Sequence, residues 1–280
     1  MILKQGFPPR LILASGAHGA DSPPPQPYPP PPPPDGRLLL AVASSNSGKV
    51  TEYSLLLSPL KCRIFGISRE ELERAGFKGI REPEEDGDSF FENARIKARY
   101  WADVLGSPAL ADDSGLEVAA LGGEPGVRSA RWGDWDPGAV SGREQSEYLI
   151  WRMEGMEDRA AAFVTSIVVA RPFRREVLHY RGTLRGEVAR EPKGSRGFGY
   201  DQAFLVPGLG LTLAELSAEE KNAVSHRGRA AGAMAGDWER VSGFLAGSAP
   251  PPGAWEPVGK PTARGESLTK FGISPINSKL

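Results

Sequence analysis

Cysteine is nearly absent from this chain, because Cys62 is the only one. A single thiol excludes an internal disulfide and a cysteine-based metal cluster, and it fits a reducing cytoplasm. Long apolar runs are also missing, since none approaches the roughly 20 residues needed to span a bilayer. The short run Leu11–Ala14 is too brief for a signal peptide, and prolines follow it at once. We therefore expect a cytoplasmic protein without a targeting segment.

An excess of charge of either sign is lacking too. The 34 basic and 35 acidic residues give a formal net charge of −1. Such a balance does not favour a protein that coats nucleic acid or adheres to a membrane surface. We expect neither nucleic acid nor a membrane among the partners, and an anionic small molecule would have to be held by a local site.

The two ends of the chain differ in composition from its middle. Pro23–Pro34 is mostly proline, which favours extended polyproline II and cannot bury a core. We expect residues 1–36 to be a disordered leader, or the product of a start codon placed too far upstream; a ligand for proline-reading domains is the alternative. Residues 248–280 are rich in Gly, Pro, Ser and Lys, and we expect a disordered tail. Residues 37–247 remain as the folded domain.

Apolar periodicity in this domain predicts strands and helices. Leu38–Ala43 is a continuous apolar run, typical of a buried strand, and a polar turn leads from it into a predicted helix at Lys49–Leu57. This strand–turn–helix start indicates an α/β fold. The other predicted elements are helices at Ser89–Leu105 and from Ser217 to His226, opened by the capping boxes Ser89/Glu92 and Ser217/Glu220, and strands at Pro108–Ala111, Gly115–Val118, Ala161–Ala170 and Glu176–Val188.

The turn Ser44–Lys49 has the composition of a phosphate-binding turn. Small residues that lead into a helix expose backbone N–H groups to phosphate oxygens, and Lys49 adds a charge. The turn is not a Walker A loop, because Ala43 stands where that motif needs Gly and Val50 stands where it needs Ser or Thr. Taken alone, an ordinary polar turn is the better interpretation.

Acidic residues gather in two segments. Asp112 and Asp113 follow the apolar strand that ends at Ala111, and adjacent carboxylates there repel each other unless a cation or hydrogen bonds compensate. Mg²⁺ prefers such oxygen ligands, although a simple Asx-type turn is the alternative. The second segment precedes the helix at Ser89, and taken alone it is best interpreted as a solvated loop; its acids are Glu82, Glu84, Glu85, Asp86 and Asp88.

Two further segments have features of a nucleotide site. Gly197–Asp201 places Phe198 between glycines, so that a flat base can stack on its ring, although a plain glycine-rich loop is equally compatible. Farther along, Ser225 can cap a helix whose first turn holds His226 and Arg227. Positive side chains there oppose the helix dipole, which an anionic ligand would explain. Two solvent-facing basic residues are the alternative.

Together these segments resemble the inosine/xanthosine triphosphate pyrophosphatase family. The similarity runs in order through the folded part and covers neither terminus. It rests most on three long collinear blocks: ALADDSGLEVAALGGEPGVRSARW (Ala109–Trp132), GFGYDQAFLVP (Gly197–Pro207) and AELSAEEKNAVSHRGRA (Ala214–Ala230).

The resemblance implies an elongated, two-lobed α/β fold, with a long curved mixed sheet flanked by helices and a nucleotide cleft between the lobes. It also implies a Mg²⁺-dependent homodimer that hydrolyses the α–β phosphoanhydride bond of ITP, dITP and XTP. The products would be the nucleoside monophosphate and pyrophosphate. Such an activity keeps deaminated purines out of DNA and RNA.

The family's motifs also assign roles to positions. Asp113 would be a metal ligand and the proton acceptor for the attacking water, with Glu84 as the other ligand and Asp112 in support. Phe198 would stack on the base, and Arg227 would donate to its 6-oxygen, which adenine lacks. The residues expected to bind substrate are Ser44, Ser45, Asn46, Ser47, Gly48, Lys49, Ser114, Phe198, Gly199, Tyr200, Asp201, Lys221, His226 and Arg227.

Two positions depart from the family pattern. Ser45 stands where glycine is usual, and its Cβ excludes glycine-only backbone angles without strain. Gln202 stands where proline is usual. A related pyrophosphatase that acts on other damaged nucleotides, pyrimidines included, is therefore an alternative. The remaining hypotheses are a nucleotide-binding module without catalysis, against which the intact acidic residues argue, and an adaptor protein built on the proline-rich leader.

Overall fold

A computed structural model describes the middle of the chain. The described residues are 37–67, 72–73, 80–133 and 140–247. The predicted leader and tail lie outside them, and so does residue 248 where the tail was expected to begin. No helix in the described ranges is both long and apolar enough to cross a membrane.

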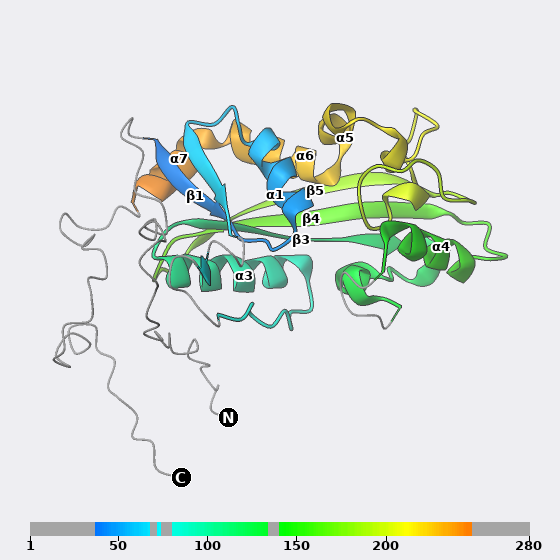
Figure 1. Ribbon diagram of the computed structural model, residues 1–280, viewed down its shortest axis with the longest axis horizontal. Helices are drawn as coiled ribbons and strands as arrows, with labels where there is room; N and C mark the ends of the chain where they lie inside the picture. Colours follow the sequence, from blue (N-terminus) through cyan, green and yellow to red (C-terminus); the bar gives the residue numbers. More distant parts are fainter. Residues whose placement is uncertain (1–36, 68–71, 74–79, 134–139, 248–280) are drawn as a thin grey trace, which may run out of the picture. The chain divides into compact units, whose positions relative to one another are not determined.

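A mixed six-stranded sheet forms the centre of the described part (Figure 1). Its strand order is β2-β1-β3-β4-β5-β6. β1 runs parallel to β2 and β3, whereas the pairs β3–β4, β4–β5 and β5–β6 are antiparallel. With helices on both faces, this confirms the α/β class and the mixed sheet. The strands are β1 (Leu38–Val42), β2 (Cys62–Gly66), β3 (Ala109–Val118), β4 (Ala160–Ala170), β5 (Val177–Val188) and β6 (Phe204–Leu205).

The prediction of two short strands around Asp112 was wrong, because β3 is a single strand of 10 residues. Its register with β4 is unbroken from Ala109↔Ala170 to Val118↔Ala161. The polar residues in its middle do not interrupt it, because backbone pairing with β4 continues through them and their side chains find partners on either side of the sheet. β2 was not predicted.

Helices cover both faces of the sheet. In Figure 1, α3 lies on one side, whereas α1, α6 and α7 lie on the other. The helices are α1 (Ser47–Leu56), α3 (Phe90–Leu105), α4 (Gly142–Arg152), α5 (Ala218–Val224), α6 (His226–Gly236) and α7 (Trp238–Ala246), with short 3₁₀ turns η1 (Ala119–Leu121), η2 (Gly126–Arg131), η3 (Asp201–Ala203) and η4 (Leu213–Glu215). α4 and α7 were not predicted.

The amphipathic pattern of α3 produces its packing. Ala94, Ala98, Trp101 and Leu105 recur at helical spacing and are buried in one cluster with alanines of β1 and β3. The predicted capping box is only half formed: the Ser89 hydroxyl accepts from the backbone N–H of Glu92, but the Glu92 carboxylate accepts from the backbone N–H of Asp88 and from the Ser89 hydroxyl, not from the Ser89 backbone N–H. The small alanine side chains between α3 and the sheet let the helix lie close to the strands.

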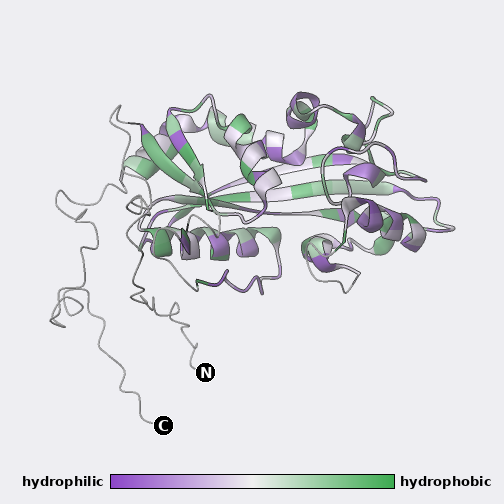
Figure 2. Cartoon of the chain, viewed as in Figure 1, coloured by the Kyte–Doolittle hydropathy of each residue, from purple (hydrophilic) through white to green (hydrophobic). Residues whose placement is uncertain are grey.

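The opposite face is packed by α1, α6 and α7. Leu110 and Ile167 of the sheet share a buried cluster with Tyr53 of α1, Met234 of α6 and Leu245 of α7. α6 lies so close to β5 that a side chain at Gly182 would collide with its backbone. In Figure 2, hydrophobic colour dominates β1 and β2, whereas α4 and α5 carry much hydrophilic colour. The close contact at Gly182 holds the first residues of α6 against the middle of the sheet.

The candidate site is placed by a stretch of strand edge that lacks a neighbouring strand. β1 pairs with β3 only at Ala41↔Ala109 and Val42↔Leu110. From Ala111 to Leu116, β3 therefore has no β-partner on that side within the described part of the chain, and beyond that stretch Glu117 forms a single bridge with Pro125. Because alternate side chains of a strand point to opposite faces, Asp112 and Asp113 lie on opposite faces of this edge. β1 ends beside them and leads into the turn at Ser44.

Candidate active site

The predicted phosphate-binding turn joins β1 to α1. Asn46 is the N-cap of α1, and its side-chain oxygen accepts from the backbone N–H of Lys49, with 3.2 Å between the atoms. The Ser44 hydroxyl accepts from the N–H of Asn46. Ser45, Asn46 and Ser47 are exposed, which leaves this turn accessible. Ser45 does not adopt glycine-only backbone angles, because among the described non-glycine residues only Phe173 has a positive φ.

Asp112 is the anionic centre of one face. Lys49 Nζ lies 3.1 Å from its Oδ2, and Arg227 Nε lies 3.3 Å from the same atom. The Ser114 hydroxyl donates to that oxygen too, and Arg227 donates to the Ser114 hydroxyl. Burial alone would raise the pKa of Asp112, but Lys49 and Arg227 hold it well below its usual range. The carboxylate is therefore ionised and fixes both cations beside the turn.

Glu52 is a second carboxylate in this network, and sequence reasoning missed it. Its two oxygens lie 2.8 Å from Lys221 Nζ and 3.1 Å from Arg227 Nη1. Burial lowers the pKa of Arg227, yet Asp112 and Glu52 raise it overall, so the guanidinium stays charged. Glu52 follows Lys49 by three residues on α1, a spacing that places both on one helix face. That spacing is the signal from which Glu52 could have been found.

The Asp113 carboxylate faces α3 on the other side of the sheet edge. Asn93 Nδ2 donates to its Oδ2 at 3.1 Å, and Lys97 Nζ lies 3.9 Å from its Oδ1. Burial raises the pKa of Asp113, against the opposing effect of Lys97 and Lys49. Asn93 and Lys97 are i and i+4 on α3, so they share a helix face. Neither residue was predicted as part of the site, although the two lie four residues apart within the helix predicted to begin at Ser89.

Glu85, rather than Glu84, is joined to Asp113 in this structure. Glu85 Oε2 lies 2.9 Å from Lys97 Nζ, so one ammonium group bridges Glu85 and Asp113. Burial lowers the pKa of Lys97, but Asp113 and Glu85 raise it overall. Glu84 is exposed. The consecutive side chains of Glu84 and Glu85 therefore differ in direction, and the sequence alone does not predict which of them faces Lys97 and Asp113.

The donor set on this face fits a hard divalent cation. Two carboxylates already face one positive charge, that of Lys97, and oxygen atoms are the ligands that Mg²⁺ prefers. No three His, Cys, Asp or Glu side chains among the described residues converge as a complete metal cage. Such a site would be completed by water and substrate phosphates, as is usual for Mg²⁺.

The predicted base-binding loop packs against this network. The Phe198 ring has Lys221 Nζ 4.6 Å and the Arg227 guanidinium carbon 5.1 Å from its centroid. Asp201 Oδ2 accepts from the Phe198 backbone N–H at 2.9 Å and from Lys221 Nζ at 2.8 Å. Tyr200 is instead buried in the core, where its hydroxyl donates to the carbonyl of Ser129 at 2.8 Å. Asp201 and Tyr200 therefore hold the loop, and Phe198 presents the ring.

His226 is a buried polar group without a partner. Its side chain is stacked on Phe163, with ring centroids 4.8 Å apart, and neither ring nitrogen has a hydrogen bond among the described residues. Burial, together with Arg227 and Lys221, puts its pKa well below the usual value, so the imidazole is neutral. A neutral imidazole offers one donor and one acceptor to a ligand. As predicted, Ser225 caps α6, so that His226 and Arg227 open its first turn.

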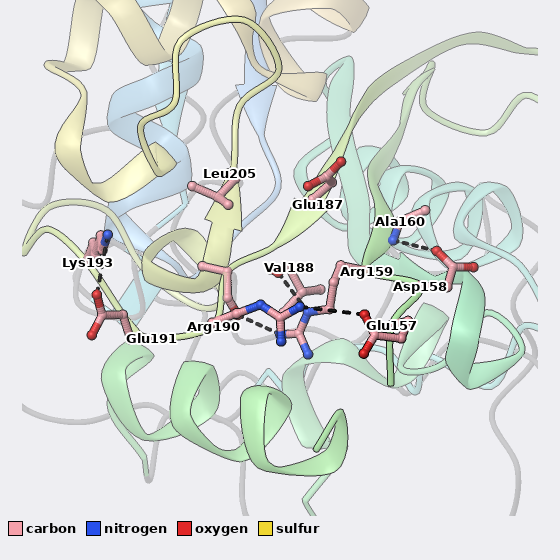
Figure 3. A pocket seen from close by; sticks show the side chains of 11 residues that line it. Glu157, Asp158, Arg159, Ala160, Glu187, Val188, Arg190, Glu191, Lys193 and Leu205 are labelled. Atoms are coloured by element: carbon pink, nitrogen blue, oxygen red, sulfur yellow. Dashed lines mark hydrogen bonds and ion pairs between the residues drawn. The ribbon is translucent and has the colours of Figure 1, made fainter. Parts of the chain in front are cut away.

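The structure thus gathers most of the predicted site residues, but the hollow in Figure 3 lies elsewhere. That hollow has a volume of about 670 Å³ and is lined by the ends of β4 and β5. It contains no predicted site residue. Acidic and basic side chains are mixed in it, and Arg159 is occupied by the carbonyls of Val188 and Ala189. Nothing in it matches the chemistry at the strand edge.

Known proteins resemble the chain over this whole domain. A "dITP/XTP pyrophosphatase" of Thermus thermophilus is 45% identical over 197 residues, which cover 70% of this chain and 89% of that protein. A protein of the same name from Deinococcus radiodurans is 42% identical and covers 70% and 90%. The solved HAM1 protein from Coxiella burnetii is 39% identical with a TM-score of 0.60, covering 75% of this chain and 99% of that one. The sequence profile of the Ham1 family matches residues 40–236, and the chain belongs to this family.

Proposed function

We propose that the protein hydrolyses non-standard purine nucleoside triphosphates (ITP, dITP and XTP) to the monophosphate and pyrophosphate. The observation that carries this proposal is the strand edge at Asp112 and Asp113, where two carboxylates and the cations Lys49, Lys97 and Arg227 surround the end of the phosphate-binding turn. The Ham1 relatives named dITP/XTP pyrophosphatase support the substrate class.

The turn from Ser44 to Lys49 would hold the phosphates. Its exposed residues and the start of α1 present backbone donors, which suit anionic oxygens. Burial lowers the pKa of Lys49, whereas Asp112 raises it, so Asp112 helps to keep Lys49 in its charged form. Lys49, Lys97 and Lys221 would stabilise the negative charge that builds on oxygen in the transition state.

Asp113 would accept the proton of the attacking water. The water oxygen forms a bond to the α-phosphorus, the bond to the β-phosphate oxygen breaks, and pyrophosphate leaves. Burial raises the pKa of this carboxyl, which makes it a better base than an exposed aspartate. Asn93 and the backbone N–H of Ser114 fix its two oxygens in place. The carboxylate is thereby held in one orientation toward the substrate.

A magnesium ion would complete the site. Asp113 would hold it, with Glu84 as the sequence indicates or Glu85 as the bridge through Lys97 favours. When bound, Mg²⁺ supplies positive charge to the phosphate oxygens and orients pyrophosphate as a leaving group. The Glu84→Gln and Glu85→Gln variants separate the two assignments: the true ligand's variant should need far more Mg²⁺ for half-maximal rate, while the other retains the wild-type requirement.

Discrimination against adenine would depend on the 6-oxygen of hypoxanthine and xanthine, whereas guanine shares this oxygen and would have to be rejected at its 2-amino group. Phe198 would stack on the base, and Arg227 would donate to that oxygen. The guanidinium already donates to Asp112, Glu52 and Ser114, whereas neutral His226 has an unpaired buried donor. His226 is therefore a second candidate for reading the oxygen. Adenine would leave such a donor unpaired, which can discriminate by about 10⁴-fold.

Assembly and location are also part of the proposal. The family resemblance supports a homodimer that acts in the cytoplasm with a small-molecule substrate, and light scattering on the purified protein tests the dimer. A single protomer mass would contradict it.

Pyrophosphate release tests the activity. We expect fast release from ITP and XTP with Mg²⁺, little from GTP or ATP, none with EDTA, and loss of the rate in Asp113→Asn. Including dUTP in the panel tests the alternative substrate class. Preference for dUTP over ITP would overturn the proposed base choice, and tight binding of ITP without hydrolysis would overturn the proposed catalysis.

A further inference from the structure

Helix α4 lies directly against the loop that carries Phe198. A Cβ built on Gly142 would lie 2.9 Å from both the backbone N and O of Gly199, and 3.3 Å from the carbonyl carbon of Phe198. These neighbours are backbone atoms, which cannot rotate away as a side chain can. Gly142 therefore allows a contact that alanine would disturb.

A hydrogen bond connects the same helix to the same residue of the loop. The Ser146 hydroxyl donates to the carbonyl of Gly199 at 3.3 Å, and the Ser146 side chain is fully buried. Ser146 follows Gly142 by four residues, so both lie on one face of α4. The start of this helix is fixed by a complete capping box of Ser141 and Glu144. The loop is thus bound to a helix whose own position is defined.

Gly199 is joined directly to Phe198, so the position of its backbone affects the position of the ring. Gly197 and Gly199 have φ values of 76° and 61°, so the backbone on both sides of Phe198 has a left-handed shape that favours glycine. The ring lies against Gly48 of the phosphate-binding turn, where a Cβ would be 3.5 Å from Phe198 Cδ1. A displacement of Gly199 would therefore move the ring relative to that turn.

We propose that α4 is a positioning element for the base, acting through Gly142 and Ser146 on the backbone of Gly199. This inference rests on the proposed function, in which Phe198 stacks on the base. Neither residue belongs to the phosphate-binding turn or to the groups around Asp112 and Asp113. Their loss should weaken the hold on the base and leave the chemical step intact.

The test compares full-length wild type with Gly142→Ala and Ser146→Ala, and uses Gly243→Ala as the control. Gly243 is also a helical glycine, in α7, but a Cβ there meets nothing within 4 Å. For each protein KM and kcat are measured with ITP, together with inhibition by tripolyphosphate, which has phosphates but no base. Circular dichroism confirms that each variant is folded.

Both α4 variants should raise KM for ITP about tenfold, as expected for a partly lost stacking contact, with kcat within about twofold of wild type. Their inhibition by tripolyphosphate should not change, and Gly243→Ala should behave as wild type. An unchanged KM in folded Ser146→Ala, or a fall in kcat alone, would overturn the proposal.

The same proteins separate this inference from the proposed function. If wild type releases no pyrophosphate, the proposed function fails, and the affinity for ITP measured by calorimetry then decides the inference. Weaker binding by both α4 variants supports it, equal binding overturns it, and absence of ITP binding by wild type overturns both.

Discussion

Asp112 lies between Lys49 and Arg227, and both of these buried contacts depend on its negative charge. Removing the charge in Asp112→Asn leaves two cations without their shared partner. At pH 7 we expect a loss of about 3 kcal/mol in the free energy of unfolding, as is typical when one member of a buried ion pair is removed. Urea unfolding measures this loss.

The acid dependence of stability provides the matching control. The pKa of Asp112 is depressed in the folded state, so its contribution is complete above the unfolded value near 3.8 and is lost as pH falls through the folded value. The difference between wild type and Asp112→Asn should therefore shrink below about pH 4. A difference that stays constant down to pH 2 would argue against charge as its cause.

The burial of Cys62 predicts that its thiol reacts slowly in the folded protein. Burial raises its pKa to about 11, and Arg37 opposes this shift only in part. At pH 8 the thiolate fraction should be about 100-fold below that of an ordinary cysteine, and access is restricted as well. Ellman's reagent should therefore react slowly with the native protein and rapidly in guanidinium chloride. Equal rates in the two solutions would contradict the burial of this side chain.

Among the elements, α6 depends on its N-cap for function. Ser225 Oγ accepts from the backbone N–H of Gly228 at 3.0 Å, and the next two residues are His226 and Arg227. Ser225→Ala should cost about 1 kcal/mol of stability and should also lower kcat/KM, because the helix start fixes both side chains. Ser242→Ala, on α7, removes a hydroxyl bonded only within its own helix and should leave kcat/KM unchanged.

Local patterns predicted the elements whose signals are local. The caps at Ser217 and Ser225 and the pair of strands β4 and β5 follow from short-range spacing, and they are confirmed. β3 was split in the prediction because Asp112 and Asp113 look like a turn, whereas pairing with β4 keeps them extended. This backbone pairing joins residues that are far apart in the sequence, so a short stretch of sequence around Asp112 does not predict it.

The candidate site residues also divide into those that local sequence predicted and those that depend on contacts between distant segments. Those inside specific blocks, such as Lys49, Asp112 and Arg227, come together as predicted. Glu52 and Lys97 were missed because each joins the candidate site only when a helix face meets residues that are distant in the sequence. The choice between Glu84 and Glu85 depends on the direction of one side chain in an irregular segment, which periodicity does not report.

At the scale of the whole molecule, the Ham1 match ends at residue 236, yet the packed domain continues beyond it. α7 begins at Trp238, and its Val241 and Leu245 are buried in the cluster that also holds Tyr53 of α1. The candidate site residues extend only from Ser44 to Arg227. The match to the family profile therefore ends before the packed domain does.

Two truncations test that difference. A chain of residues 37–247 should keep the kcat, KM and melting temperature of the full chain, because it retains every site residue and α7. A chain of residues 37–236 should lose about 2–5 kcal/mol of stability, as expected when buried aliphatic side chains are removed from a core. Its active site would remain complete in sequence, so any loss of rate should follow the loss of folded protein. Equal melting temperatures for the two truncations would show that α7 contributes nothing to the core, and reduced activity of 37–247 would assign a role to one of the terminal segments.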